Sequence, residues 1–327
     1  MDIKLVPMAR WSGSERTPLV IAGPCAAESE DQVLETARRL AGARVHYFRA
    51  GIWKARTRPN TFEGIGEKAL PWLRRAGAES GLKTATEVAQ PHHVELALEH
   101  DIDLLWIGAR TTVNPFPVQE LANALRGTDV PVLIKNPTSP DLALWMGAIE
   151  RVHGAGVRAL GAIHRGFSVG GKSLYRNQPM WDIVIELRRT MPELPIITDP
   201  SHISGSRDLI QSISQRAMDF GIDGLMIKTH PNPDQAWSDA AQQITPERLS
   251  EIIRQPHVRT SGTDDASANR SLEERREAID QVDQQLLSVL EKRSNVVQRI
   301  GEWKRAKNVK PFQVARWKAL PADRMDR

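Results

Sequence analysis

Eight short apolar runs recur along the chain and alternate with longer stretches of helical periodicity. The runs cover 18–23, 45–51, 82–88, 103–109, 131–135, 159–164, 194–199 and 223–227. Strands that alternate with helices form parallel sheets, and eight such units over about 250 residues are typical of a closed (β/α)8 barrel, or TIM barrel. An open, doubly wound sheet is the alternative. The pattern therefore predicts an α/β fold, with the barrel preferred.

The pattern changes after the eighth run. Residues 259–270 are small, polar and turn-rich, as linkers are. Ser271 and Glu274 then have the spacing of a capping box, which predicts a long helix from Ser271 to about Lys307. We therefore expect three parts, a barrel domain over 1–258, a linker over 259–270 and a helical segment over 271–327.

Composition limits the class of function. The 327 residues include a single cysteine, so no intrachain disulfide can form, which fits a reducing cytoplasm. No apolar run is long enough to span a membrane, and the N-terminus lacks the apolar core of a signal peptide. The net charge is +4, but no basic run is interleaved with aromatic residues, so nucleic acid is not an expected partner.

Charged and polar side chains end or follow all eight runs, and most of the charged ones are cationic. In a (β/α)8 barrel the active site lies at the carboxyl ends of the strands, so these side chains should converge. Converging Arg and Lys suit phosphate and carboxylate groups, although any one of them alone is usually a solvated loop residue. The sequence therefore predicts phosphorylated or polyanionic substrates. The side chains are Cys25, Arg49, Lys54, Arg56, Thr57, Glu87, Arg110, Lys135, His164, Arg165, Asp199, Ser201, His202, Lys228, His230 and Asp239.

Two further patterns have competing interpretations. Cys25, His202 and Asp239 would suit a divalent transition metal such as Zn, Fe or Mn if the fold brought them together, but each alone is usually a core or loop residue. Residues 166–173, GFSVGGKS, match the P-loop pattern. A P-loop needs a helix directly afterwards, and Pro179 interrupts that stretch. A Gly-rich loop over the barrel mouth is the preferred interpretation.

Six motifs occur in a fixed order along the barrel region. They are K-A-R-T (54–57), I-G-A-R (107–110), Lys135, H-R-G (164–166), D-P-S-H (199–202) and H-P-N-P-D…S-D (230–239). Together they resemble the type I DAHP synthases, especially their short-barrel beta subgroup, over roughly residues 18–250. This family condenses phosphoenolpyruvate with erythrose 4-phosphate, the first step of the shikimate pathway. The resemblance implies the same fold and the same transferase activity.

The resemblance also implies roles for individual residues. Arg56 and Thr57 would bind erythrose 4-phosphate. A divalent metal (Mn, Fe, Zn or Co) would polarise the aldehyde as a Lewis acid, with Cys25, His202 and Asp239 as three of its four ligands. The expected catalytic residues are Lys54, His202, Asp239 and Cys25. The expected phosphoenolpyruvate ligands are Arg49, Lys54, Ala109, Arg110, Lys135 and Arg165, with Arg110 and Arg165 at the phosphate.

Two positions depart from the family pattern. Ala55 stands where the family has the Pro of K-P-R-T, and Lys228 stands where it has the fourth metal ligand, the Glu of I-E-x-H. An ammonium group offers donors where a metal needs a lone pair, so we expect weak metal binding and strongly reduced turnover, both restored by Lys228→Glu. In one interpretation the cation takes the metal's place and pairs with Asp239 and Cys25.

The C-terminal segment has a stripe of its own. Residues spaced by three and four share one helical face: Arg276, Ile279, Asp283, Leu286, Leu290, Arg293, Val297, Ile300 and Lys304. A coiled coil with salt bridges would explain it, and so would a dianion pocket within a helical bundle, because charges in an apolar stripe need partners. We expect the helix to pair with a second copy, giving a homodimer.

This segment resembles the first helix of the all-helical chorismate mutases. The resemblance implies that Arg276, Arg293 and Lys304 bind chorismate or prephenate. Gln313 and Trp317 stand where that family commonly has Asp and Glu. We therefore expect an incomplete mutase domain with negligible mutase activity.

Three other functions compete with the synthase. An octulosonate-phosphate synthase typically has K-A-N-R after the second strand, whereas Arg56 and Thr57 favour the four-carbon sugar. A catalytically impaired, ligand-binding regulatory variant is favoured by Lys228. A Schiff-base aldolase would use Lys135 or Lys228.

Overall fold

A computed structural model describes residues 4–13, 18–54, 60–171, 173–254 and 265–313. The chain divides into two compact units, Met1–Arg259 and Thr260–Arg327. The first unit contains the strands and most of the helices, and the second contains one long helix.

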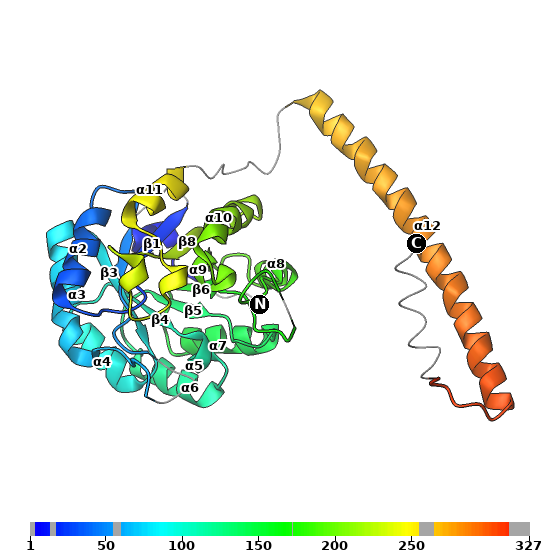
Figure 1. Cartoon of the computed structure of the whole chain (residues 1–327), viewed down its shortest axis with the longest axis horizontal. Coiled ribbons are helices and arrows are strands. Elements are labelled where there is room, and N and C mark those ends of the chain that lie inside the picture. Colours follow the sequence, from blue (N-terminus) through cyan, green and yellow to red (C-terminus); the bar gives the residue numbers. More distant parts are fainter. Residues whose placement is uncertain (1–3, 14–17, 55–59, 172, 255–264, 314–327) are drawn as a thin grey trace. The chain divides into compact units, whose positions relative to one another are not determined.

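Eight parallel strands form the centre of the first unit and close into a barrel in sequence order (Figure 1). The barrel closes because β1 pairs with β8 as well as with β2. Each strand overlaps one of the eight predicted runs, so the TIM-barrel prediction is confirmed and the open sheet is excluded. The strands are β1 Leu19–Gly23, β2 Tyr47–Arg49, β3 Lys83–Val88, β4 Leu104–Ile107, β5 Val132–Lys135, β6 Leu160–His164, β7 Ile196–Thr198 and β8 Gly224–Lys228.

Helices surround the barrel and connect its strands. Several begin at a side chain that accepts a hydrogen bond from the first turn, such as Ser29 before α2 and Asp141 before α7. The α-helices are α1 Met8–Ser12, α2 Glu30–Leu40, α3 Leu70–Ser80, α4 Pro91–Glu99, α5 Ala109–Thr112, α6 Pro115–Ala124, α7 Leu142–Gly154, α8 Trp181–Thr190, α9 Pro200–Ser204, α10 Ile210–Asp219 and α11 Pro246–Arg254. Short 3-10 turns are η1 Gly66–Ala69, η2 Arg207–Leu209, η3 Pro233–Gln235 and η4 Ala240–Gln242.

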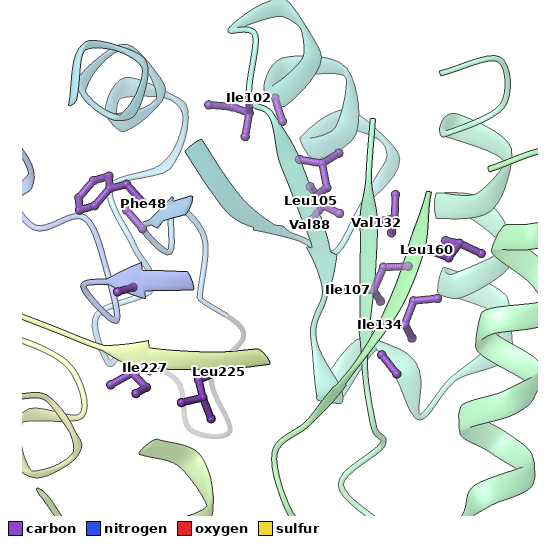
Figure 2. Close-up of a cluster of buried hydrophobic side chains, with 14 of the residues drawn as sticks. Phe48, Val88, Ile102, Leu105, Ile107, Val132, Ile134, Leu160, Leu225 and Ile227 are labelled. Atoms are coloured by element: carbon purple, nitrogen blue, oxygen red, sulfur yellow. The ribbon is translucent and has the colours of Figure 1, made fainter. Parts of the chain in front are cut away.

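The strands bury side chains on both faces. Leu19 and Ile21 point into the barrel, whereas Val20 and Ala22 pack outward against the helices, as the two-residue period of a strand requires. Figure 2 shows part of the outer layer, where strand residues such as Leu105 and Ile134 are completely buried. The barrel is therefore a filled core, and its chemistry has to lie at an end.

Helix α1 closes the amino-terminal end of the barrel. The Trp11 side chain belongs to the interior cluster, and the Trp11 carbonyl accepts hydrogen bonds from Tyr47 Oη at 2.8 Å and Lys83 Nζ at 2.9 Å. With this end filled, the carboxyl ends of the strands form the mouth of the barrel.

The second unit is the long helix α12, Ala266–Ala306. The predicted start at Ser271 is wrong by five residues, because Asp265 caps the helix by accepting from the backbone N–H groups of Ser267 and Ala268. Ser271 therefore lies inside the helix, and the expected linker 259–270 includes its first turn. No described helix is long and apolar enough to cross a membrane.

The predicted stripe of α12 lies largely in solvent within the described residues. Leu286, Leu290 and Ile300 are 56%, 46% and 50% exposed. Apolar side chains at such exposure on a 41-residue helix leave a large surface for a partner.

Candidate active site

A cavity of about 220 Å³ opens at the carboxyl ends of the barrel strands. Nine of the residues expected to bind substrate or metal line it, although they come from the ends of seven different strands or the connections that follow them. Arg56 and Thr57, the expected ligands of erythrose 4-phosphate, lie outside the described residues together with Ala55. The cavity is lined by Cys25, Arg49, Lys54, Glu87, Ala109, Arg110, Lys135, Thr138, Arg165, Ser168, Arg176, Asn177, His202 and Asp239.

Arg49, at the end of β2, is the most deeply buried cation on the cavity wall. Its side chain is 1% exposed, and its guanidinium carbon lies 4.7 Å from the centre of the Trp106 ring. Its Nε and Nη1 atoms have no hydrogen-bond partner among the described residues. A buried cation without acceptors is costly, so this arrangement suits an anionic ligand that supplies them.

Lys135, the last residue of β5, donates to Asp199 Oδ2 at 3.0 Å. Burial lowers the pKa of Lys135 to about 8, although the neighbouring Asp199 partly opposes this shift. Burial raises the pKa of Asp199, but His202 and Lys135 more than compensate, so it stays well below its usual range. Lys135 is therefore a cation that loses its proton only slightly above neutral pH.

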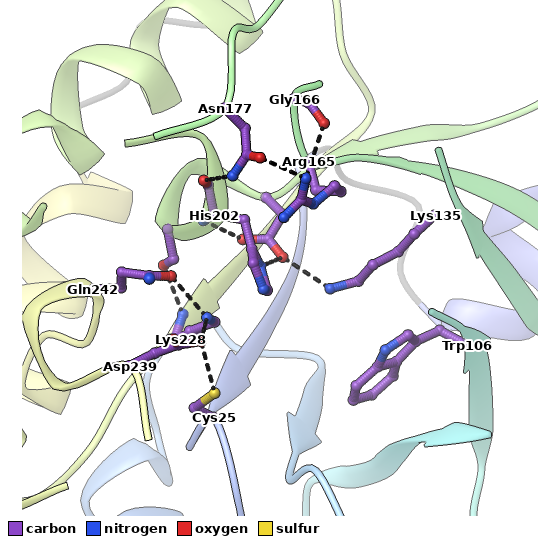
Figure 3. A network of polar contacts seen from close by, with 12 residues as sticks. Cys25, Trp106, Lys135, Arg165, Gly166, Asn177, His202, Lys228, Asp239 and Gln242 are labelled. Carbon is purple, nitrogen blue, oxygen red and sulfur yellow. Dashed lines mark hydrogen bonds and ion pairs between the residues drawn. The ribbon is translucent and has the colours of Figure 1, made fainter. Parts of the chain in front are cut away.

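His202 lies beside this pair (Figure 3). Its Nδ1 is 2.6 Å from Asp199 Oδ2. Burial lowers the pKa of His202 well below its usual value despite the opposing effect of Asp199. A neutral ring that donates its Nδ1–H to Asp199 carries its lone pair on Nε2.

Arg165 is held in place by two asparagines. Its backbone N–H donates to Asn136 Oδ1 at 2.7 Å, and its Nη1 donates to Asn177 Oδ1 at 2.8 Å. Asn177 in turn donates from Nδ2 to the carbonyl of His202 at 2.7 Å. Burial lowers the pKa of Arg165 to about 10, which leaves it charged at neutral pH.

The Gly-rich segment is a loop at the cavity. No helix follows Ser173 directly, since α8 begins at Trp181, so the P-loop interpretation is excluded. An antiparallel bridge between Phe167 and Gln178 closes the loop at its base. Ser168 lies next to this bridge and lines the cavity. This position agrees with the predicted Gly-rich loop at the barrel mouth.

Five cavity residues were missed or given no role by the sequence patterns. They are Glu87, Thr138, Ser168, Arg176 and Asn177. The sequence could have indicated Glu87. It lies near the end of the predicted run 82–88, and the next run, 103–109, has a glycine, Gly108, near its own end. A Cβ atom on Gly108 would lie 2.2 Å from Glu87 Oε1, so this glycine makes room for the carboxylate, which also accepts from Trp106 Nε1 at 2.9 Å.

The expected metal site has a different arrangement. Lys228 ends β8 with no exposed surface, and its Nζ donates to Asp239 Oδ2 at 2.6 Å and to Gln242 Oε1 at 2.9 Å. Cys25 Sγ donates to the same Asp239 Oδ2 at 3.3 Å and accepts from Lys54 Nζ at 3.3 Å. In the part of the chain that the structure describes, no group of three or more His, Cys, Asp or Glu side chains could hold a metal ion. The implied ligand set therefore does not fit a metal here.

The cations dominate the electrostatics of this group. Burial raises the pKa of Cys25, but Lys228 and Lys54 lower it further, so that it falls below its usual value. Burial likewise raises the pKa of Asp239, but Lys228 and His202 together more than compensate, so this pKa falls well below its usual value. Asp239 is thus ionised at any physiological pH. It sits in the left-handed region with φ of 50°, a conformation that Asp tolerates better than most residues.

A cavity at the carboxyl end of a closed (β/α)8 barrel is where enzymes of this fold class have their active sites, and here its walls are cationic. The chain belongs to the DAHP synthetase I family, whose model matches residues 6–260, and its residues 275–327 match the model of chorismate mutase type II. It is accordingly an enzyme of the DAHP synthase kind, a transferase, with a chorismate mutase segment. The family prediction is confirmed for both parts.

Individual relatives agree with this assignment. A phospho-2-dehydro-3-deoxyheptonate aldolase of Thermotoga maritima is 32% identical over 237 residues, covering 72% of this chain and 68% of the relative. A crystal structure of that enzyme superposes with a TM-score of 0.65 at 30% identity, over 73% of this chain and 67% of the other. A 2-dehydro-3-deoxyphosphooctonate aldolase of Caulobacter vibrioides is 28% identical over 257 residues, covering 72% of this chain and 84% of the relative. The octulosonate alternative is therefore the weaker one.

Proposed function

We propose that the barrel condenses phosphoenolpyruvate with erythrose 4-phosphate to give DAHP and inorganic phosphate. The observation that carries the proposal is the buried guanidinium of Arg49, whose Nε and Nη1 lack acceptors among the described residues. Lys54, Arg110, Lys135 and Arg165 line the same cavity. Phosphoenolpyruvate carries a phosphate and a carboxylate on three carbons, so it suits a small cavity with this many cations.

The proposed contacts divide the substrate between two groups of cations. Arg110 and Arg165 bind the phosphate, whereas Arg49, Lys54 and Lys135 bind the carboxylate and its surroundings. Ala109, another of the expected phosphoenolpyruvate ligands, lines the same cavity. Because Arg165 is fixed by hydrogen bonds to Asn177 and Asn136, little side-chain entropy is lost when the phosphate binds.

In the reaction, C3 of phosphoenolpyruvate attacks the aldehyde carbon and forms the new carbon–carbon bond, while the aldehyde oxygen takes up a proton. Water adds to C2, which has become electron-poor, and phosphate then leaves. Lys54, whose Nζ contacts Cys25 at the cavity wall, is the proposed proton donor to the aldehyde oxygen. His202, Asp239 and Cys25 complete the proposed catalytic set around it.

The test is phosphoenolpyruvate consumption with two aldose phosphates. We expect turnover with erythrose 4-phosphate to exceed turnover with arabinose 5-phosphate, and equal or reversed preference would refute the assignment. Phosphoenolpyruvate binding without turnover on either sugar would favour the regulatory variant instead. Trapping by borohydride with pyruvate would favour the Schiff-base alternative, for which Lys135 is the cavity-lining candidate.

A cytoplasmic location is part of the proposal. The single cysteine, Cys25, and the metabolites that the proposed reaction uses both support it. Small molecules are then the expected partners of the barrel.

For the C-terminal segment we propose an antiparallel pair of α12 helices in a homodimer. The half from 266 to 286 carries five acidic and three basic residues, whereas the half from 287 to 306 carries two acidic and five basic residues. Antiparallel pairing places each acidic half against a basic half, and it buries the exposed stripe on both copies.

The same pairing supports a shared site for chorismate or prephenate. Arg276 and Arg293 are 17 positions apart, which on a helix is about 26 Å, so one small dianion cannot contact both in one copy. Pairing centred between Leu286 and Leu290 places Arg276 of the second copy opposite the segment from Val296 to Lys304. The proposed binding site for the dianion is then formed by both copies. One copy contributes Arg293 and Lys304, and the other contributes Arg276.

A further inference from the structure

The ammonium group of Lys228 lies in a site that is built for one cation. Two acceptors are directed at it, Asp239 Oδ2 at 2.6 Å and Gln242 Oε1 at 2.9 Å, and Lys228 and Gln242 are both buried. Burying an ammonium group is unfavourable unless acceptors replace its water. Here the fold supplies them from the turn η4 and the residue before it.

This cation is connected to the cavity wall through shared atoms. Asp239 Oδ2 accepts from Lys228 and also from Cys25 Sγ, and Cys25 Sγ accepts from Lys54 Nζ. Lys54, Cys25 and Asp239 line the cavity, whereas Lys228 lies behind it without exposed surface. Lys228 therefore acts on the cavity only through the residues that it holds.

Lys228 also gives this position the same net charge that a Glu with a bound divalent ion would give. The family pattern has Glu here with a divalent ion, and members of the family are generally metal-dependent. A carboxylate and a divalent ion together contribute one positive charge, and an ammonium group contributes the same charge from one residue. The lone pair of Asp239 Oδ2 that would face an ion is directed at Lys228 Nζ instead.

We propose that Lys228 is the resident cation of the barrel mouth, a positioning residue that holds Asp239 and Gln242, so that the chain takes up no divalent metal at this position. This inference is independent of the proposed substrates, because it concerns the folded chain alone.

The experiment is a Co²⁺ titration of the full chain without substrates, followed by the cobalt–thiolate charge-transfer absorption and by metal content after desalting. The unchanged chain should show no saturable absorption band. Lys228→Glu should bind one equivalent with a band that a second change, Cys25→Ser, removes. Lys228→Gln, which removes the ammonium group without adding a carboxylate, should bind more tightly than the unchanged chain but at least about tenfold more weakly than Lys228→Glu.

A band in the unchanged chain that saturates at one equivalent and disappears with Cys25→Ser would overturn the inference. So would a lack of any gain in Co²⁺ affinity in a variant that circular dichroism shows to be folded. If Lys228→Glu does not fold, Lys228→Gln decides the matter against the unchanged chain. If the unchanged chain shows no synthase activity, that result contradicts the proposed function but not this inference, because the Co²⁺ titration uses no substrate.

Discussion

Arg165 combines a half-buried position with a charge that persists at neutral pH. At the proposed phosphate site it would donate charge-assisted hydrogen bonds, so we expect Arg165→Ala to weaken phosphoenolpyruvate binding by about 2 kcal/mol, or roughly 30-fold. Calorimetry measures this directly. Arg74→Ala is the matched control, because Arg74 is 59% exposed and pairs with Asp101 outside the cavity. Equal affinity of the two variants would remove Arg165 from the site.

The lowered pKa of Lys135 predicts that phosphoenolpyruvate binding depends on pH. With a pKa of about 8 in the folded chain, it loses its charge as the pH rises past that value, while Asp199 stays ionised and repels the substrate. Phosphoenolpyruvate affinity should therefore fall from about pH 7 to about pH 9.5, and Lys135→Arg should flatten the profile. An unchanged chain with a flat profile would contradict this role.

The same shift affects stability in the opposite direction. A lysine whose pKa is lowered by folding destabilises the folded state fully below the folded pKa. That penalty is relieved as the pH rises from about 8 toward the unfolded value near 10.4. Over this window, the Lys135 contribution to the free energy of unfolding rises with pH even as binding weakens.

The loop between β6 and α8 is connected to the active site through the side-chain amide of Asn177. Asn177 accepts from Arg165 Nη1 and from Ser168 Oγ and donates to the His202 carbonyl. Asn177→Ala should weaken phosphoenolpyruvate binding by about 1 kcal/mol, less than the loss for Arg165→Ala. Because Asn177 would act through Arg165, the double variant should be no worse than Arg165→Ala. Additive losses in this cycle would show that the amide contacts the substrate directly.

The stripe of α12 makes a prediction about assembly. Leu286→Glu would put a charge near the centre of the proposed antiparallel pair, so the homodimer should dissociate to monomers in sedimentation at equal concentration. Gln284→Glu is the control. It introduces the same charge two residues before Leu286, on the opposite face of the helix, and should leave the dimer intact. Identical sedimentation of both variants would argue against this interface.

At the scale of the whole molecule, the chain separates into two compact units. A chain ending at Arg259 should keep its phosphoenolpyruvate affinity within about twofold, because every described residue that lines the cavity belongs to the first unit. It should also be monomeric if α12 provides the dimer contact. A large loss of affinity would show that the second unit supports the barrel site.

Much of the fold follows from local pattern. Runs such as 131–135 and 194–199 predicted strands because side chains on a strand alternate between two faces that are both buried here. The start of α12 was mispredicted for an equally local reason. Asp265 and Ser271 are both good caps, and only the observed contacts from Asp265 to Ser267 and Ala268 decide between them.

The strand pattern was enough to predict which side chains lie at the strand ends, because a closed parallel barrel brings all its carboxyl ends to one mouth. The sequence also showed that Lys228 occupies a position where a carboxylate was expected. One interpretation of the sequence already paired Lys228 with Asp239, but its second partner, Gln242, lies in a later turn whose path no local pattern specifies. The role of Asn177, which contacts Arg165 and the His202 carbonyl, was hidden for the same reason. Hydrogen bonds and ion pairs depend on distances of a few ångströms between distant segments, whereas periodicity reports only which face of an element is buried.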